Sequence, residues 1–188
     1  MTDATDFPTW AATACHDLAL AARDVSASAF DALADEVVAA GRIALHGLGR
    51  EGLMMRALTM RLFHLGLQAS PVGDMTTPPL GAGDLLIVSA GPGAFETVGA
   101  LMGIARDAGA RVVLLTAEAA APLREKADLV LRLPARTMAR PVGEPSIFTM
   151  GSAYEAVLLL FSEYLVGRLA QRLTAGEAEM RARHTNLE

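Results

Sequence analysis

The stretch GRIALHGLGREGLMMRA, from Gly41 to Ala57, decides the fold of this 188-residue chain. It opens with a short apolar run that is typical of a buried strand. Three glycines follow, Gly47, Gly49 and Gly52, and beyond them apolar residues recur at helical spacing. The stretch therefore predicts a strand that turns tightly into a helix through a glycine loop.

The three glycines also match the G-x-G-x-x-G pattern of dinucleotide-binding turns, which by itself is a weak signal. A dinucleotide site would place an acidic residue about 20 residues further on. The candidate, Asp74, lies beyond that spacing and follows a segment that contains Pro71 and Gly73. Two other roles stay open for the loop: a tight turn without a ligand, or a set of backbone N–H groups that holds a phosphate.

Strand-like and helix-like segments alternate on both sides of this stretch. Two helical segments are predicted over 8–40, the second capped by Ser26 or Ser28. A polar loop over 136–145 precedes a predicted helix over about 148–173 and a further turn or two. The remaining strands are predicted, with helices between them, within 67–73, 84–91, 110–118 and 128–135.

This alternation predicts an α/β fold with a parallel sheet covered by helices on both faces. The length favours a single domain over 1–188. Within it we expect N-terminal helices over 1–40, an α/β core over 41–135 and C-terminal helices over 146–188.

Composition excludes several classes of protein. Hydrophobic residues make up 52% of the chain and charged residues 20%, as expected for a globular core. The net charge of -5 argues against a nucleic-acid partner. No run approaches the roughly 20 apolar residues of a membrane span, and MTDATDFPTW lacks the features of a signal peptide, so we expect a cytoplasmic protein without a membrane partner. The single cysteine, Cys15, is expected to be a buried small residue rather than a nucleophile.

A second glycine loop, SAGPG, follows the most apolar strand at residues 89–93. Because the carboxyl ends of parallel strands meet at one edge of a sheet, the two glycine loops together predict an anion cradle. Arg50 would neutralise a dianion there, although an ordinary surface arginine is an equal alternative. The residues we select for substrate binding are loop glycines, hydroxyl groups and this one cation: Gly47, Gly49, Arg50, Thr76, Thr77, Ser89 and Gly91.

Longer motifs resemble the sugar isomerase (SIS) domain family, and within it the 6-phospho-3-hexuloisomerases. GRIALHGLGREGLMMRALTMRLFHLGL resembles the family's first strand, glycine turn and FAMRLMHLG helix. VGDMTTPPLGAGDLLIVSAG resembles its VGETTTP loop and the strand that follows. MGSAYEAVLLLF and RARHTNLE resemble its MGTxFE helix start and its C-terminal RHxNL. The resemblance covers nearly the whole chain, in the same order.

The resemblance implies the flavodoxin-like SIS fold, a three-layer αβα sandwich with a five-stranded parallel sheet and extra N- and C-terminal helices. It also implies a homotetramer, or a dimer, with active sites between subunits, and no metal or other cofactor. The implied reaction converts 3-hexulose 6-phosphate to fructose 6-phosphate. In it a base removes the C2 proton, a cis-enediol forms, and the proton returns to C3.

Two residues become catalytic candidates through this resemblance. Glu155, in MGSAYEAVLL, is the candidate base, although a glutamate early in a helix also stabilises the helix dipole. His184, in RHTNLE, is the candidate for proton transfer to and from the sugar oxygens, because imidazole titrates near neutral pH. Without the resemblance it would be taken for an exposed residue near the end of the chain. In this family such a histidine reaches the site of a neighbouring subunit.

One segment departs from the family pattern. The usual loop after the third strand, S-G-S-G or S-x-S, is SAGPG here, and Pro92 has no amide proton to donate. Two function classes therefore stay open: an isomerase of this or another phosphosugar, and a sugar-phosphate-binding module that senses without converting. Glu155 and His184 favour the isomerase, because binding alone requires neither.

Overall fold

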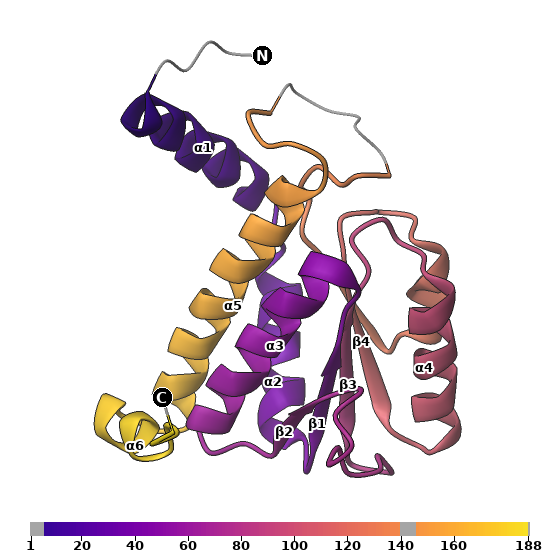
Figure 1. The fold of residues 1–188 in the computed structure, drawn as a ribbon. Helices are drawn as coiled ribbons and strands as arrows, with labels where there is room; N and C mark the ends of the chain where they lie inside the picture. The colour runs from indigo at the N-terminus through magenta and orange to yellow at the C-terminus, as the bar shows by residue number, and fades with distance from the viewer. Residues whose placement is uncertain (1–5, 140–145, 188) are drawn as a thin grey trace.

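Five parallel strands form one sheet with helices on both faces in the computed structural model, which describes residues 6–139 and 146–187 (Figure 1). The first half of the chain contains α1 (Phe7–Ala22), α2 (Ala27–Ala39), β1 (Ile43–His46), α3 (Gly49–His64), β2 (Ala69–Pro71) and β3 (Leu85–Ser89). The second half contains α4 (Glu96–Asp107), β4 (Arg111–Thr116), the 3-10 helix η1 (Pro122–Lys126), β5 (Leu129–Arg132), α5 (Ser152–Arg172) and α6 (Glu177–Ala182).

The strands lie in the order β2-β1-β3-β4-β5, and all neighbouring pairs are parallel. The chain first moves to one side of β1 and then crosses to the other, which creates a topological switch point between β1 and β3. His46, the last residue of β1, pairs with Val88 near the end of β3. The two glycine loops therefore leave the sheet side by side, as predicted.

Each face of the sheet buries its own apolar core, because side chains alternate along a strand. Ile43 and Leu45 of β1 face the core shared with α2, α3 and α5. Ala44 faces the core shared with α4. Every residue of the central strand β3 is buried, as expected when both faces are covered. Figure 1 shows α2, α3 and α5 on one side and α4 on the other, which confirms the predicted three-layer sandwich.

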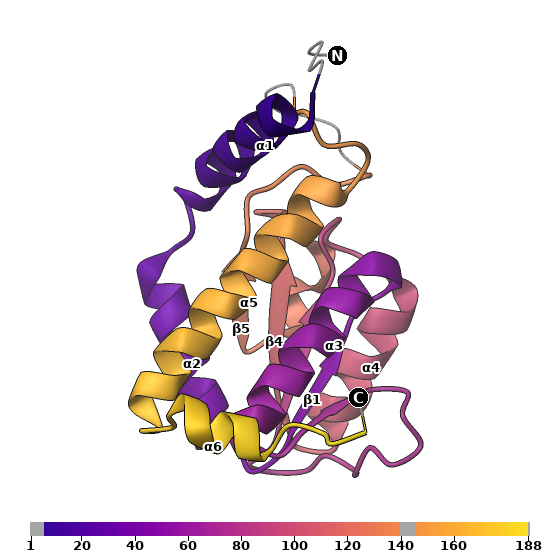
Figure 2. The same ribbon diagram turned by 60° about the vertical axis from the view of Figure 1, so that its left-hand side comes forward.

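The N-terminal helix α1 extends away from the sheet (Figures 1 and 2). It contacts the segment before α5, where the rings of Trp10 and Phe148 lie 5.7 Å apart in an edge-on arrangement. Cys15 is exposed on α1, so its predicted burial is wrong. The reason is that α1 packs on little besides α5, so much of its surface has no apolar partner within the chain.

Several predicted boundaries are confirmed and others shift. Ser26 caps α2 by accepting a hydrogen bond from the Ala29 N–H group at 3.2 Å. The long C-terminal helix begins at Ser152, later than predicted. The predicted loop over 136–145 includes 140–145, which lie outside the described residues. Within 6–139 and 146–187, no helix has the length and hydropathy that crossing a bilayer requires.

The glycine turn between β1 and α3 depends on a close backbone contact. A Cβ atom on Gly52 would lie 2.5 Å from the carbonyl oxygen of Gly47. Gly49 has a φ of 56°, a conformation that residues with side chains rarely adopt. The predicted strand, turn and helix are confirmed, and packing accounts for Gly47 and Gly52.

We predict that Gly52→Ala lowers the free energy of unfolding by about 1–3 kcal/mol, because the added methyl group must push α3 away from the end of β1. Gly103→Ala on α4 is the matched control. No atom lies within 4 Å of the Cβ position there, and we expect it to stabilise the chain by about 0.5–1 kcal/mol. Urea unfolding at a fixed protein concentration measures both. Equal effects of the two variants would contradict the close-contact explanation.

Candidate active site

A pocket of about 320 Å³ opens beyond the carboxyl ends of the strands. Its walls come from the glycine loop and first turn of α3, from the loop after β3, from the segment after β5 and from the start of α5. The polar lining residues and the glycine of the loop include Gly49, Arg50, Glu51, Ser152, Tyr154 and Glu155. The pocket thus lies at the switch point of the sheet, where ligands bind in open α/β folds.

Three helices begin at this pocket without a side-chain cap. Their N-cap residues are Leu48 for α3, Phe95 for α4 and Gly151 for α5, and none of these side chains accepts a hydrogen bond from the helix. All three residues line the pocket. The first N–H groups of a helix lack partners within it and carry the positive end of its dipole. The pocket is therefore suited to an anion.

Arg50 links the starts of α3 and α5. Its Nε atom lies 2.8 Å from Oε2 of Glu155, and its Nη1 atom donates to the Ser152 hydroxyl at 3.2 Å. Among the described residues, Oε2 of Glu155 has this ion pair but accepts no hydrogen bond of good geometry. The Glu155 side chain is only 15% exposed, whereas Arg50 is 65% exposed. A mostly buried carboxylate thus faces the pocket beside a movable cation.

Glu51 is the main site residue that the sequence analysis missed. Its Oε2 atom accepts hydrogen bonds from the Ser89 hydroxyl at 2.6 Å and from the Gly91 N–H group at 3.0 Å. The Tyr154 hydroxyl lies 3.2 Å from Ser89 Oγ and must donate to it, because the Ser89 proton already points to Glu51. The two donors that were expected to hold the substrate's phosphate instead hold this carboxylate.

The missing second serine of the loop now has a structural explanation. A Cβ atom at Gly91 would lie 2.8 Å from the Tyr154 ring and 3.0 Å from Oε1 of Glu51. Any side chain at this position would push either group away. Glycine at position 91 therefore accompanies glutamate at position 51, since the carboxylate fills the space that a side chain would need.

Burial raises the pKa of Glu51 above its ordinary value of 4.5. The hydrogen bonds from Ser89 and Gly91 oppose this rise, and the charge of Glu155 adds to it. Burial, together with the negative charge of Glu51, raises the pKa of Tyr154. Two carboxylates thus share one pocket, and one of them is shifted toward its neutral form, an arrangement that suits acid–base chemistry.

Thr76 and Thr77 do not line this pocket. The Thr76 hydroxyl and N–H group both donate to Asp74, and the Thr77 hydroxyl donates to the Pro71 carbonyl oxygen at 2.7 Å. These bonds shape the loop after β2. Asp74 is engaged in this turn, on the loop rather than in the pocket. Gly47 likewise supports the turn from outside the pocket lining, whereas Gly49 and Arg50 line it.

His184 lies at the far end of α3 from the pocket. Its ring lies beside that of His64 in a tilted arrangement, with centroids 5.1 Å apart, and Arg183 donates to the His64 carbonyl oxygen. Because an α-helix rises 1.5 Å per residue, the ends of α3 are roughly 20 Å apart. Within one chain, His184 and Glu155 are therefore not brought together.

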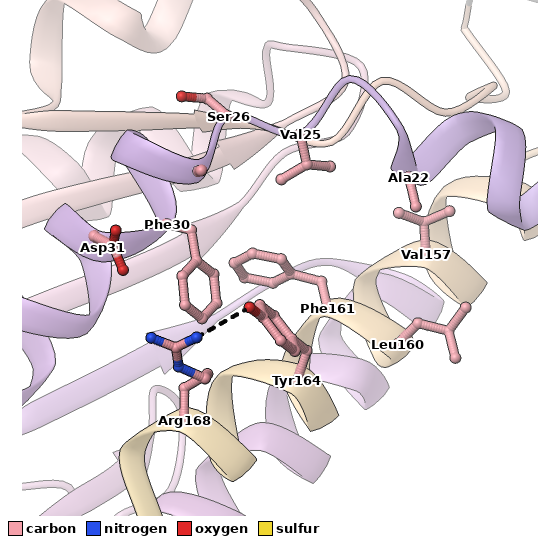
Figure 3. A pocket seen from close by; sticks show the side chains of 11 residues that line it. Ala22, Val25, Ser26, Phe30, Asp31, Val157, Leu160, Phe161, Tyr164 and Arg168 are labelled. Carbon is pink, nitrogen blue, oxygen red and sulfur yellow. Dashed lines mark hydrogen bonds between the residues drawn. The ribbon is translucent and has the colours of Figure 1, made fainter. Parts of the chain in front are cut away.

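A second pocket of about 410 Å³ lies between α5 and the junction of α1 with α2 (Figure 3). Its walls are mainly apolar, with the rings of Phe30, Phe161 and Tyr164 around it. Arg168 donates to the Tyr164 hydroxyl at 3.5 Å. This lining contains none of the predicted substrate-binding or catalytic residues.

The sheet order and the pocket at its switch point fit the SIS class of phosphosugar isomerases. The comparisons with known proteins support this. The chain is 38% identical over 161 residues to a 3-hexulose-6-phosphate isomerase of Methylomonas aminofaciens. The aligned region covers 84% of this chain and 87% of that enzyme. It is 33% identical to the enzyme of that name from Bacillus subtilis, over 92% of this chain and 94% of the relative. No family model matches the chain.

A solved structure with the same fold supports this classification. A Methanococcus jannaschii protein, whose crystal structure inferred the function of a 3-hexulose-6-phosphate isomerase, superposes with a TM-score of 0.82 at 28% identity. The match covers 95% of this chain and 98% of that one. The chain belongs to the 3-hexulose-6-phosphate isomerase family, the hexuloisomerase branch that the motifs indicated. It is an enzyme of the phosphosugar isomerase type, which favours the isomerase over the sensing module.

We predict that Glu51→Gln stabilises the chain increasingly as pH rises. A raised carboxyl pKa means that the folded state binds more protons than the unfolded state, so stability is lost as pH rises through the folded pKa. Glutamine keeps an oxygen for Ser89 and Gly91 but does not ionise. Urea unfolding between pH 5 and 8 measures the gain, with Glu125→Gln at an exposed position as the control. A gain that stays constant with pH would contradict the raised pKa.

Proposed function

We propose that this chain interconverts 3-hexulose 6-phosphate and fructose 6-phosphate through a cis-enediol, with Glu155 as the base. The observation that carries the proposal is Glu155 itself, a mostly buried carboxylate that faces the pocket and is held by Arg50. The names of the relatives supply the substrate. One carboxylate serves for both carbon positions, because C2 and C3 are neighbours.

The phosphate of the substrate is proposed to bind at the uncapped starts of α3 and α5, beside Arg50. Ser89 and Gly91 are not proposed as its anchors, because Glu51 already accepts their hydrogen bonds. The starts of α3 and α5 offer N–H groups without side-chain caps, and Ser152 adds a hydroxyl.

With substrate bound, Arg50 would lie beside two negatively charged groups, the Glu155 carboxylate and the phosphate. In the chain without substrate it pairs with Glu155 and hydrogen bonds with Ser152. A phosphate dianion would compete for the guanidinium, which forms its strongest hydrogen bonds in paired geometry with such groups. Substrate binding would thereby draw Arg50 from Glu155 and leave the carboxylate free to accept the C2 proton.

We further propose a homo-oligomer, a tetramer or dimer, in which His184 of a neighbouring subunit contacts the sugar oxygens. Helices α3 and α5 lie side by side (Figure 2), and their outer faces leave large apolar side chains exposed. Phe63 is 53% exposed, Leu160 53% and Tyr164 55%. Apolar surface of this kind marks contact sites between proteins. Assembly would also resolve the separation between His184 and Glu155 within one chain.

We predict that Glu155→Gln lowers kcat for 3-hexulose 6-phosphate by about 10²–10⁴-fold, because the amide cannot accept the C2 proton. A coupled assay that detects fructose 6-phosphate measures the rate, and circular dichroism checks the fold. Glu125→Gln, at an exposed position remote from the pocket lining, is the control. Activity of Glu155→Gln within a few-fold of wild type would remove Glu155 from its role.

The shared site predicts complementation between two inactive variants. Chains with Glu155→Gln and chains with His184→Ala, co-expressed with different tags, would form mixed assemblies in which some sites contain both intact residues. For randomly paired subunits we expect about a quarter of the wild-type activity to return. Full activity of His184→Ala alone, or no gain on mixing, would contradict a site shared between subunits.

A further inference from the structure

Glu51 can exchange a proton, but the reaction proposed above gives it no role in a proton transfer. It lines the pocket with Glu155, but only 9% of its surface is exposed. A buried carboxylate that served only to join α3 to the loop after β3 would carry an unnecessary cost, because burial disfavours its charge. A neutral amide would join the same donors without that cost.

Hydrogen bonding distinguishes the two oxygens of Glu51. Oε2 accepts from both Ser89 and Gly91. Within 6–139 and 146–187, no hydrogen bond is formed by Oε1. When Glu51 is neutral, its proton therefore belongs on Oε1, and the absence of a side chain at Gly91 leaves room beside that atom. In its neutral form Glu51 would therefore present a free O–H group to the pocket.

The charged and titratable groups around Glu51 favour this neutral form at rest. From α5 it faces Tyr154, which is itself neutral, and the negative charge of Glu155. From its own helix comes Arg50, but that cation is paired with Glu155. The loop after β3 contributes only uncharged donors. Burial and the neighbouring carboxylate together raise the pKa of Glu51, against the two hydrogen bonds.

We propose that Glu51 is the acid–base group that moves the proton between the two sugar oxygens, while Glu155 moves the proton between the two carbons. This inference rests on the proposed function. As Glu155 takes the C2 proton, the C2–C3 double bond forms and O3 takes the proton from Oε1 of Glu51. In the second half, the Glu51 carboxylate takes the proton of O2, C2=O forms, and C3 regains the proton from Glu155. Both carboxyl groups end as they began.

The experiment compares wild type with Glu51→Gln in steady-state kinetics. The side-chain amide keeps the shape and accepts the same two hydrogen bonds, but it cannot exchange a proton with O3 or O2. We expect kcat to fall by about 10²–10⁴-fold while KM stays within a few-fold, because binding contacts remain. The wild-type rate should fall at high pH as Glu51 loses its proton, and Glu51→Gln should lack this alkaline decline.

Ser89→Ala provides a second test, the pH at which the rate declines. A purely structural role of Glu51 would leave this pH unchanged. The Ser89 hydrogen bond lowers the pKa of Glu51, so its loss should raise that pKa and shift the alkaline decline to higher pH. An inactive wild type would overturn the proposed function and this inference with it. An active wild type with Glu51→Gln within a few-fold, or an alkaline decline that persists unchanged in that variant, would overturn the inference alone.

Discussion

The contact between Gly47 and Gly52 is the constraint on which the rest of the site depends. It lets the end of β1 meet the first turn of α3 without an intervening side chain. Because α3 begins so close to the sheet, Glu51 in its first turn reaches across to the loop after β3, and Arg50 beside it reaches the start of α5. The close contact of these two glycines therefore positions two charged side chains at the pocket. The apparent dinucleotide pattern follows from this packing requirement.

The buried Glu51 carboxylate explains why the loop after β3 departs from the pattern of its family. The loop has lost the second serine because Glu51 and Tyr154 occupy the space beside Gly91. The anion-binding donors remain, but the carboxyl group of Glu51 accepts their hydrogen bonds. In the proposed function the phosphate therefore binds at the uncapped helix starts that line the pocket.

The pocket combines two carboxylates with different surroundings. Glu155 is mostly buried and forms an ion pair with the exposed side chain of Arg50. Glu51 lies among uncharged donors in a drier position, which favours its protonated form. In the reaction proposed here, one carboxyl group moves a proton between the two carbons and the other moves a proton between the two oxygens. His184 lies at the opposite end of α3, and large apolar side chains of α3 and α5 are exposed.

The sequence by itself determined the fold class, the strand order along the chain, the glycine turn, the family and the candidate base, because these depend on local periodicity and on contiguous motifs. It also placed Arg50 at the ligand edge. Only the tertiary structure decided that Glu51 meets Ser89 and Gly91, that Thr76 and Thr77 face their own loop, and that His184 lies far from Glu155. These outcomes depend on contacts between residues that are distant in the sequence. Helix direction and side-chain packing determine such contacts, and a short sequence motif does not specify either.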